Sequence, residues 1–331
     1  MNIIKCIFAT LNNQTNHPLR VLVYFYFISL CGACLSPKER AGTFLCMTDS
    51  YQREIKLDKA PEKIISLSPA ITEMLFLLGA EDKLIGISEY CNYPEETQRI
   101  RKVGGLQNIN IETIISLQPD VVLIGSIITK KEVDKLEKSG ITVIAMKQED
   151  KLEGMLEVLR VLGQIVDNEQ CADSLVGYYG KKLDYYKHAD DADEQDLRRN
   201  SKNKIRVNPS NLRHLRAPTV YYVVSFGAAG DYTAPANSHI HEIIELAGGR
   251  NIGESLTTWN ISREYLFAQN PDLIFVRTEE LPHFVKTYPY NLLRAVQENR
   301  VYPIESGWMD VISPRNFLAI EEIRGKIRLL R

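Results

Sequence analysis

The sequence predicts an α/β fold, with two Rossmann-like α/β lobes joined by one long rigid helix and a ligand cleft between the lobes. Three observations predict it. Short apolar segments rich in β-branched residues alternate with helical segments, which is typical of parallel sheets. Residues 110–124 align without a gap with residues 262–276 and share their pattern. Residues 151–186 form an uninterrupted helical pattern between the two copies.

The N-terminal lobe is expected over residues 60–150. Its first helix has clear boundaries, because Ser68 can cap it, Pro69 suits its first turn and Gly79 suits its end. The expected strands are 63–68, 84–88, 120–125 and 141–145, and the expected helices are 69–78, 111–117 and 131–139.

Two segments separate the lobes. Residues 151–186 carry apolar side chains near the helical period, contain no Pro and exceed the usual length of a globular helix, so we expect a rigid connecting helix. Residues 187–217 collect acidic residues followed by basic ones and hold few apolar side chains. Segregated charge with low hydrophobicity predicts a solvated insert.

The C-terminal lobe is expected over residues 218–331 and repeats the alternating pattern. Its expected strands are 219–225, 272–276 and 301–304, and its expected helices are 240–247 and 314–330. Within the internal repeat, identical residues stand at three equivalent positions: Glu112 with Glu264, Pro119 with Pro271, and Asp120 with Asp272. Two related halves predict a bilobal protein, and ligands prefer clefts at domain interfaces.

The first 34 residues have the features of an export signal. An uncharged apolar run at residues 21–30 is too short to span a bilayer as a helix of ~20 residues, but it suits the apolar core of a signal peptide. Cys34 follows two small residues in a pattern that resembles the lipobox of bacterial lipoproteins, although Cys31 stands where that motif usually has Leu. We therefore expect lipidation at Cys34 and a polar tether at 35–59. A cleaved secretory signal without lipid is the alternative.

Composition and motifs exclude several functional classes. Hydrophobic residues make up 44% and charged residues 25% of the chain, as in soluble globular proteins. The net charge of -2 argues against nucleic acid as a partner, since phosphate binding needs concentrated positive charge. The sequence has no phosphate-binding loop, dinucleotide fingerprint, zinc motif or spaced pair of nucleophile and base. We therefore expect a protein that is not an enzyme and has neither a cofactor nor a resident metal.

Several segments in a fixed order match one family. They are ISLSPAITE at 65–73, YCNYP at 90–94, IETIISLQPD at 111–120, LAGGRNIG at 246–253, Trp259 with SRE at 262–264, and Trp308 with SPR at 313–315. The chain thereby resembles the helical-backbone class of ABC-importer binding proteins for cobalamin, haem and ferric siderophores, and its cobalamin-binding members above all. The resemblance covers residues 63–326. It implies a periplasmic or otherwise extracytoplasmic, lipid-anchored protein that captures a metal chelate, with a corrinoid favoured.

In this family, aromatic side chains line a shallow cleft, and aromatic faces bury a broad ring system at little entropic cost. The resemblance assigns this role to four matching residues and two neighbours: Tyr90, Tyr93, Trp259, Trp308, Phe226 and Tyr232. Leu106 stands where cobalamin-binding members have another cleft tryptophan and some haem binders have an iron-ligating tyrosine. This departure disfavours haem ligation at Leu106 and also weakens the match to cobalamin binders.

Glu112 and Glu264 match two glutamates that, in this family, enter arginine pockets on the two subunits of the permease, which works with cytoplasmic ATPases. Carboxylate–arginine pairs supply both geometry and affinity. The resemblance thus implies a permease dimer as the partner. A solvated glutamate at the start of each helix is the alternative.

Other functions stay open at this point. A ferric siderophore or haem would suit the same importer class, and an anionic siderophore would need cleft arginines, for which Arg263, Arg277 and Arg315 are the candidates. A chelatase-like enzyme is also compatible with a two-lobed α/β fold, because fold does not settle function. The export signal favours the binding protein.

Overall fold

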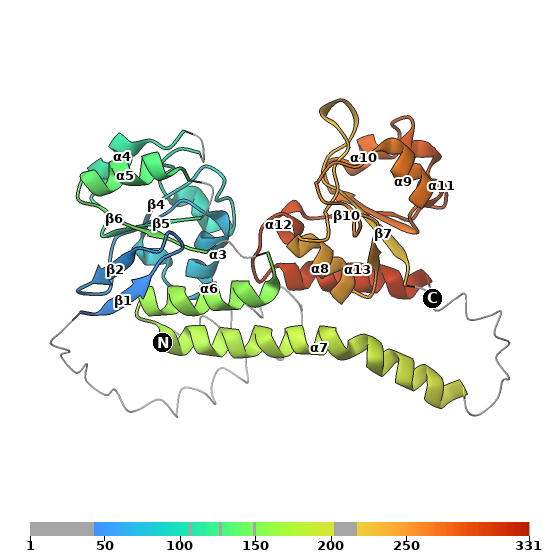
Figure 1. Ribbon diagram of the computed structural model, residues 1–331, viewed down its shortest axis with the longest axis horizontal. Coiled ribbons are helices and arrows are strands. Elements are labelled where there is room, and N and C mark those ends of the chain that lie inside the picture. Colours follow the sequence, from blue (N-terminus) through green and yellow to red (C-terminus); the bar gives the residue numbers. More distant parts are fainter. Residues whose placement is uncertain (1–42, 106–107, 126–127, 148–149, 202–216, 331) are drawn as a thin grey trace. The chain divides into compact units, whose positions relative to one another are not determined.

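The structure is a computed structural model, and it describes residues 43–105, 108–125, 128–147, 150–201 and 217–330, the side chains of 189–201 excepted. The chain divides into two compact units. Unit 1 comprises Met1–Gln148 and Val158–Leu175, and unit 2 comprises Glu149–Glu157 and Val176–Arg331. In Figure 1 the sheet of unit 1 is coloured blue to green, and the sheet of unit 2 is yellow to red.

Unit 1 contains a four-stranded parallel sheet with the strand order β4-β3-β5-β6. Its strands are β3 (Ile64–Ser66), β4 (Leu84–Ile87), β5 (Val121–Ile124) and β6 (Thr142–Ala145). Its helices are α3 (Pro69–Leu77), α4 (Ile111–Leu117) and α5 (Lys130–Lys138), with short 3-10 helices at Glu81–Lys83 and Glu95–Arg99. The strands and helices predicted for this lobe are confirmed, with small shifts of their ends.

The local sequence explains where these helices begin and end. Pro69 lies in the first turn of α3 and Gly79 follows its end at a φ of 66°, a conformation that favours glycine. Ser68 precedes α3 in an extended conformation, but its side chain makes no capping hydrogen bond, so only its position agrees with the prediction. α5 begins with a full capping box between Thr129 and Glu132.

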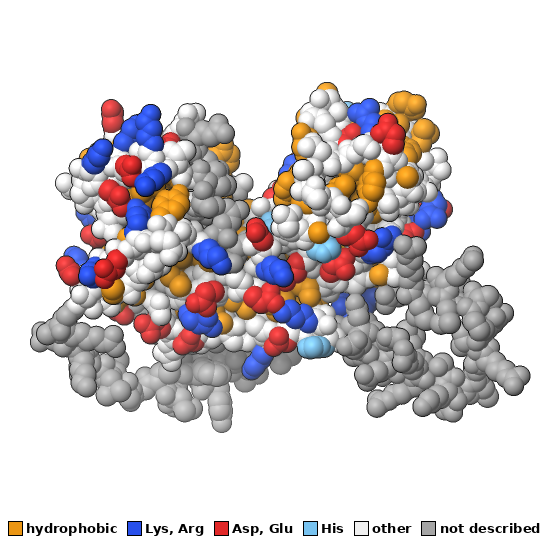
Figure 2. All heavy atoms as spheres, viewed as in Figure 1, with side chains coloured by type: hydrophobic (Ala, Val, Ile, Leu, Met, Phe, Trp, Pro, Cys, Tyr) orange, Lys and Arg blue, Asp and Glu red, His pale blue; other side chains and the backbone are white. Residues whose placement is uncertain are grey.

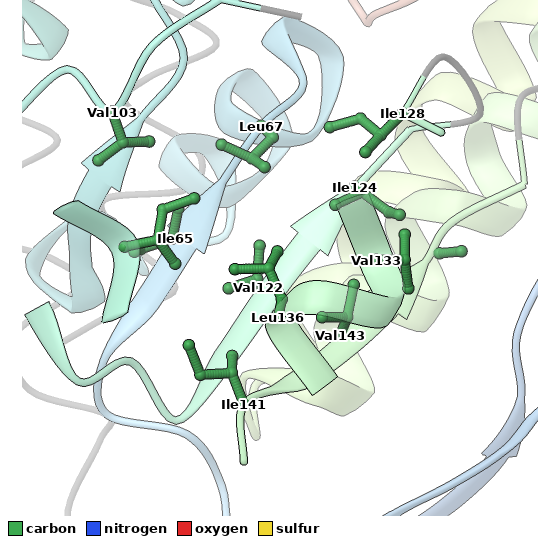
Figure 3. Packing of buried hydrophobic residues seen from close by; sticks show 12 residues of the cluster. Ile65, Leu67, Val103, Val122, Ile124, Ile128, Val133, Leu136, Ile141 and Val143 are labelled. Atoms are coloured by element: carbon green, nitrogen blue, oxygen red, sulfur yellow. The ribbon is translucent and has the colours of Figure 1, made fainter. Parts of the chain in front are cut away.

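One hydrophobic core of unit 1 lies on the face of the sheet that meets α4 and α5 (Figure 3). Alternate strand residues point to that face, as the two-residue period of a strand requires. They are Ile65 and Leu67, Val122 and Ile124, and Val143 and Ala145. All four residues of β5 are buried, so both faces of the sheet are covered. Burial on both faces explains why this strand reads as a continuous apolar run.

The predicted tether at 35–59 is wrong in its second half. β1 (Leu45–Thr48) pairs antiparallel with β2 (Glu54–Leu57). The buried Asp49 carboxylate, in the turn between them, accepts the backbone N–H of Ala145 at 3.2 Å, which ties the hairpin to β6. The hairpin escapes sequence reasoning because its few alternating apolar residues do not stand out from a polar segment.

Unit 2 contains a second four-stranded parallel sheet with the order β10-β9-β7-β8. Its strands are β7 (Thr219–Val223), β8 (Arg250–Asn251), β9 (Leu273–Arg277) and β10 (Val301–Ile304). Its helices are α8 (His239–Leu246), α9 (Arg263–Gln269), α10 (Leu281–Phe284), α11 (Arg294–Gln297), α12 (Ser306–Met309) and α13 (Asn316–Leu330), with 3-10 helices at Gly227–Ala229 and Tyr290–Leu292. When the four strands of each sheet are numbered in chain order, the two sheets have the same order: second, first, third and fourth. Unit 1 is read from β4 and unit 2 from β8.

The internal repeat maps α4 and β5 onto α9 and β9. Asn110 accepts the backbone N–H of Thr113 at the start of α4, as Ser262 accepts that of Tyr265 at the start of α9. Each helix then ends in a residue in the left-handed conformation, which is Gln118 or Asn270. The sequence repeat is therefore confirmed as a structural repeat.

The predicted connecting helix at 151–186 is two helices. α6 (Leu152–Ile165) and α7 (Glu169–Ser201) are separated by a turn in which Asp167 has a φ of 60°. Within unit 1, a Cβ on Gly163 would lie 2.3 Å from the Cβ of Ala172, so the absence of that side chain lets α6 and α7 approach closely. The prediction of one helix was wrong because the apolar period continues across the turn.

The first part of the predicted insert at 187–217 also differs, because α7 continues through it to Ser201 (Figure 1). Residues 202–216 lie outside the described part of the chain, as do residues 1–42, which include the predicted signal peptide. No helix among the described residues is long and apolar enough to cross a membrane.

Candidate functional site

The described aromatic residues of the predicted site follow the carboxyl ends of strands. Two follow β4 in unit 1, and the other four follow β7, β8 and β10 in unit 2. Open parallel sheets bind ligands at this edge, because the loops that leave the strands gather there. They are Tyr90 and Tyr93, then Phe226 and Tyr232, then Trp259 and Trp308.

In unit 1, Tyr90 and Tyr93 lie on one loop. Tyr90 is 56% exposed and Tyr93 is 37% exposed, so part of each residue faces solvent. A Cβ on Gly105 would lie 3.3 Å from the Tyr90 ring, which means that this ring lies close over the backbone of Gly105. The loop therefore offers aromatic surface beside the carboxylate of exposed Glu89.

A buried polar cluster around Cys91 anchors the Tyr90–Tyr93 loop to the body of unit 1. The Cys91 thiol lies 3.2 Å from Thr72 Oγ1 and 3.1 Å from Ser88 Oγ. Lys102 Nζ donates to the Cys91 carbonyl at 2.5 Å. Burial raises the pKa of the Cys91 thiol, so this group is a protonated packing residue at neutral pH.

In unit 2, Phe226, Tyr232 and Trp259 lie on neighbouring backbone segments. Tyr232 forms isolated antiparallel bridges with Ser225 and Asn260, and Thr233 N–H donates to the Trp259 carbonyl at 2.9 Å. These contacts bring the segment around Tyr232 beside the segment around Trp259. Trp259 is 40% exposed, which leaves part of its indole open to solvent.

Phe226 packs on Tyr290, which sequence reasoning did not identify. The two rings meet edge to face with centroids 5.5 Å apart. The Tyr290 hydroxyl donates to Asp231 Oδ1, and the Gly227 N–H donates to the Tyr290 oxygen at 2.9 Å. The Tyr290 side chain thus fixes the loop after β7 from beneath.

Trp308 lies on α12, the short helix after β10. Buried Asn316 donates to the Trp308 carbonyl at 2.8 Å, and His239 Nε2 lies 2.7 Å from the Met309 carbonyl. Burial lowers the pKa of His239, which favours the neutral ring. These contacts hold the backbone of Trp308 in place.

A polar cluster lies beside Trp308 at the same edge of the sheet. Tyr222 donates its hydroxyl to Asp310 Oδ1 at 2.7 Å, while Arg277 Nε and Nη2 lie 3.0 and 2.8 Å from Asp310 Oδ2. Burial and then the Asp310 carboxylate raise the pKa of Tyr222, so its hydroxyl stays a donor. Sequence reasoning missed Tyr222, because its partner is distant in the chain and only strand alternation hints at its direction.

Glu112 and Glu264 are both exposed, each in the first turn of its repeated helix. The prediction that the repeat places two carboxylates at equivalent points of the two units agrees with this placement. Whether they meet a partner stays a prediction.

Two predicted residues, Leu106 and Cys34, lie outside the described residues. The cleft expected between the lobes stays a prediction. Within the described ranges, no group of three or more His, Cys, Asp or Glu residues could hold a metal ion. On the face drawn in Figure 2, acidic and basic side chains are interspersed and hydrophobic side chains reach the surface of both units.

Known proteins resemble the chain in sequence and in fold. Residues 64–306 match the model of a family described as periplasmic binding protein. An uncharacterized ABC transporter substrate-binding lipoprotein of Bacillus subtilis is 25% identical over 296 residues, which cover 88% of each chain. The vitamin B12-binding protein of Vibrio vulnificus is 27% identical over 276 residues, which cover 81% of this chain and 91% of the relative. A solved periplasmic haem-binding protein of Pseudomonas aeruginosa shares the fold, with a TM-score of 0.67 at 20% identity over 81% of this chain and 92% of that chain.

Proposed function

The chain belongs to the periplasmic binding protein family, and from that premise we propose that it captures cobalamin or another corrinoid outside the cytoplasm and delivers it to an ABC permease. The observation that carries the proposal is the set of partly exposed aromatic rings at the carboxyl ends of the strands in both units. Rings of this kind bury the broad apolar faces of a flat macrocycle. The similarity to a vitamin B12-binding protein supports the choice of ligand.

The arginines that an anionic siderophore would need are already engaged. Arg263 pairs with Asp231, Arg277 pairs with Asp310, and the Arg315 guanidinium lies directly against the backbone of Gly307. Redirecting a paired guanidinium to a ligand would leave its carboxylate uncompensated, which is costly in a partly buried site. This arrangement favours a ligand held by apolar faces over a highly charged one.

Iron in haem takes an axial ligand from the protein in many binders, whereas the cobalt of cyanocobalamin carries its own axial ligands. The aliphatic Leu106 offers no such ligand. This chemistry disfavours haem ligation at Leu106, and haem held without that ligand is the alternative for the same importer class.

Delivery needs a contact with the membrane partner. Glu112 and Glu264 are exposed carboxylates at equivalent points of the structural repeat, and we assign them to arginine pockets on the two permease subunits. Ion pairs of this kind set orientation and association rate. The cytoplasmic ATPases would then drive transport.

Membership of this family implies a place outside the cytoplasm. We assign membrane attachment to acylation of Cys34, with support from the Bacillus subtilis relative, whose name includes lipoprotein. Mass spectrometry of protein from the membrane fraction would reveal a diacylated N-terminal cysteine, while an unmodified mature N-terminus would contradict the anchor.

Absorption spectra of the purified protein, incubated separately with cyanocobalamin, haemin and a ferric siderophore and then freed of unbound ligand, test the choice of ligand. We expect the corrinoid bands to be retained with the protein. Retention of haemin or the ferric chelate with loss of cyanocobalamin would assign the chain to the alternative ligand.

A further inference from the structure

In unit 2, one carboxylate connects the loop after β7, called here the aromatic loop because it holds Phe226 and Tyr232, to the start of α9. Asp231 belongs to the loop after β7, and its side chain is only 7% exposed. Its Oδ2 atom accepts Arg263 Nε at 2.9 Å, and its backbone carbonyl accepts the N–H of Ile261 at 3.0 Å. The first residue of α9 is therefore bonded directly to this loop.

The same carboxylate is bonded to the aromatic surface on its other side. Its Oδ1 atom accepts the Tyr290 hydroxyl, and the Tyr290 ring packs against Phe226. The Arg263 guanidinium also lies over the Tyr290 ring, 5.7 Å from its centroid. Contacts thus run without a break from Phe226 through Tyr290 and Asp231 to Arg263.

Glu264, the proposed docking residue, follows Arg263 in the first turn of α9. In unit 1 the equivalent of Arg263 is Ile111, which begins α4 and packs on the apolar core of that unit. An isoleucine cannot make an ion pair, so this connection belongs to unit 2 and not to its repeat partner. The repeat therefore keeps both docking carboxylates but links only one of them to an aromatic loop in this way.

We propose that Arg263 is a positioning residue through which a ligand bound on the aromatic loop of unit 2 orders the first turn of α9 and the docking residue Glu264. This inference rests on the proposed function. A ligand ring that packs on Phe226 restricts the motion of the loop and of the Asp231 carboxylate. Because Asp231 is paired with Arg263, the Arg263 guanidinium and the start of α9 then lose conformational freedom. Docking of the loaded protein then costs less ordering entropy than docking of the free protein, which is positive coupling.

Hydrogen exchange with and without saturating cyanocobalamin tests this coupling. In the parent protein we expect loading to slow exchange over residues 262–266 by roughly fivefold, the lower end of typical coupling between sites. Residues 110–114 of α4 are the internal control and should not respond through this route. In Arg263→Ile, which copies the residue found in unit 1, cyanocobalamin should still bind but the slowing over 262–266 should be lost.

Arg294→Ile is the matched control, because Arg294 pairs with Asp272 and has a side-chain exposure of 47%, against 48% for Arg263. It should respond to loading like the parent. Arg263→Gln serves the same test if the Ile variant folds poorly. Slowing that persists in variants lacking the Arg263 charge, or is absent from a parent that binds cyanocobalamin, would overturn the coupling and leave the proposed function intact. A parent that does not bind cyanocobalamin would remove both.

Discussion

Asp120 in unit 1 and Asp272 in unit 2 make the same contact at the start of the first strand of their own sheets. Asp120 Oδ2 accepts the N–H of Lys63 at 2.9 Å, and Asp272 Oδ2 accepts the N–H of Thr219 at 2.9 Å. Each aspartate follows the repeated helix and its proline. The repeat is therefore preserved as a bonding pattern that joins the repeated helix to the start of the sheet.

Replacing either aspartate with Ala should destabilise its unit by about 1–2 kcal/mol, because backbone N–H groups lose an ionised acceptor, with the effect reduced by partial exposure. Urea unfolding of Asp120→Ala and Asp272→Ala measures this. Asp58→Ala, which removes an exposed carboxylate five residues before Lys63 in the sequence, is the control and should unfold like the parent. A parent-like midpoint for both aspartate variants would contradict the structural role of the pattern.

Trp259→Ala and Trp308→Ala should each weaken cyanocobalamin binding by about 1–3 kcal/mol, because a ligand-contacting aromatic face is removed. Fluorescence or calorimetric titration gives the affinities. Tyr288 is 76% exposed and outside the predicted site, so Tyr288→Ala is the matched aromatic control. If both tryptophan variants bind like that control, the rings do not line the ligand site.

Glu112 and Glu264 should serve the partner and leave the ligand site unaffected. The double Ala variant should keep the parent affinity for cyanocobalamin, while association with the permease in nanodiscs and vitamin uptake are lost. The double Arg variant should dock even less well through repulsion by the arginine pockets. Association that survives in the double Ala variant would show that these carboxylates are not the docking pair.

Glu242 should make stability depend on pH near neutrality. Burial, assisted by the neighbouring Glu153 charge, raises the pKa of Glu242 to about 7, although the Leu152 N–H bonded to its Oε2 opposes the shift. The pKa of an unfolded glutamate is about 4.3, so the folded state binds the proton more tightly between about pH 4 and 7. This contribution to stability is full below that window and is lost as the pH rises through it.

The variant Glu242→Gln keeps an acceptor for the Leu152 N–H but does not titrate. Its free energy of unfolding, measured in urea at pH 5 and pH 8, should fall less with rising pH than that of the parent. Glu254→Gln removes an exposed carboxylate in unit 2 and should retain the parent slope. Equal slopes for Glu242→Gln and the parent would place the pH dependence elsewhere.

Much of the fold could be predicted because its signals are local. Strand and helix periods, with the turn chemistry of Pro69 and Gly79, located the elements of unit 1, and the repeat located α9 and β9. The turn at Asp167 could not be predicted, because neither Gly nor Pro marks it and the apolar period continues on both sides. The hairpin at 45–57 depends on the contact of Asp49 with Ala145, which lies 96 residues away in the sequence.

The candidate site divides in the same way. Trp259 and Trp308 could be chosen from motif matches, and the structure places both after strands. The carboxylates and phenols that support the loops, such as Asp231 with Tyr290 and Asp310 with Tyr222, come from segments far apart in sequence. Their association depends on the sheet order, which a one-dimensional pattern does not contain.

Calorimetric titration of the purified parent protein with cyanocobalamin tests the central claim most directly. We expect saturable one-to-one binding with micromolar or tighter affinity, which corresponds to a binding free energy of about -8 kcal/mol or more favourable. A folded parent protein that shows no saturable binding at ligand concentrations of about 1 mM, where even a free energy near -4 kcal/mol would be detected, would contradict the assignment of this chain to corrinoid capture.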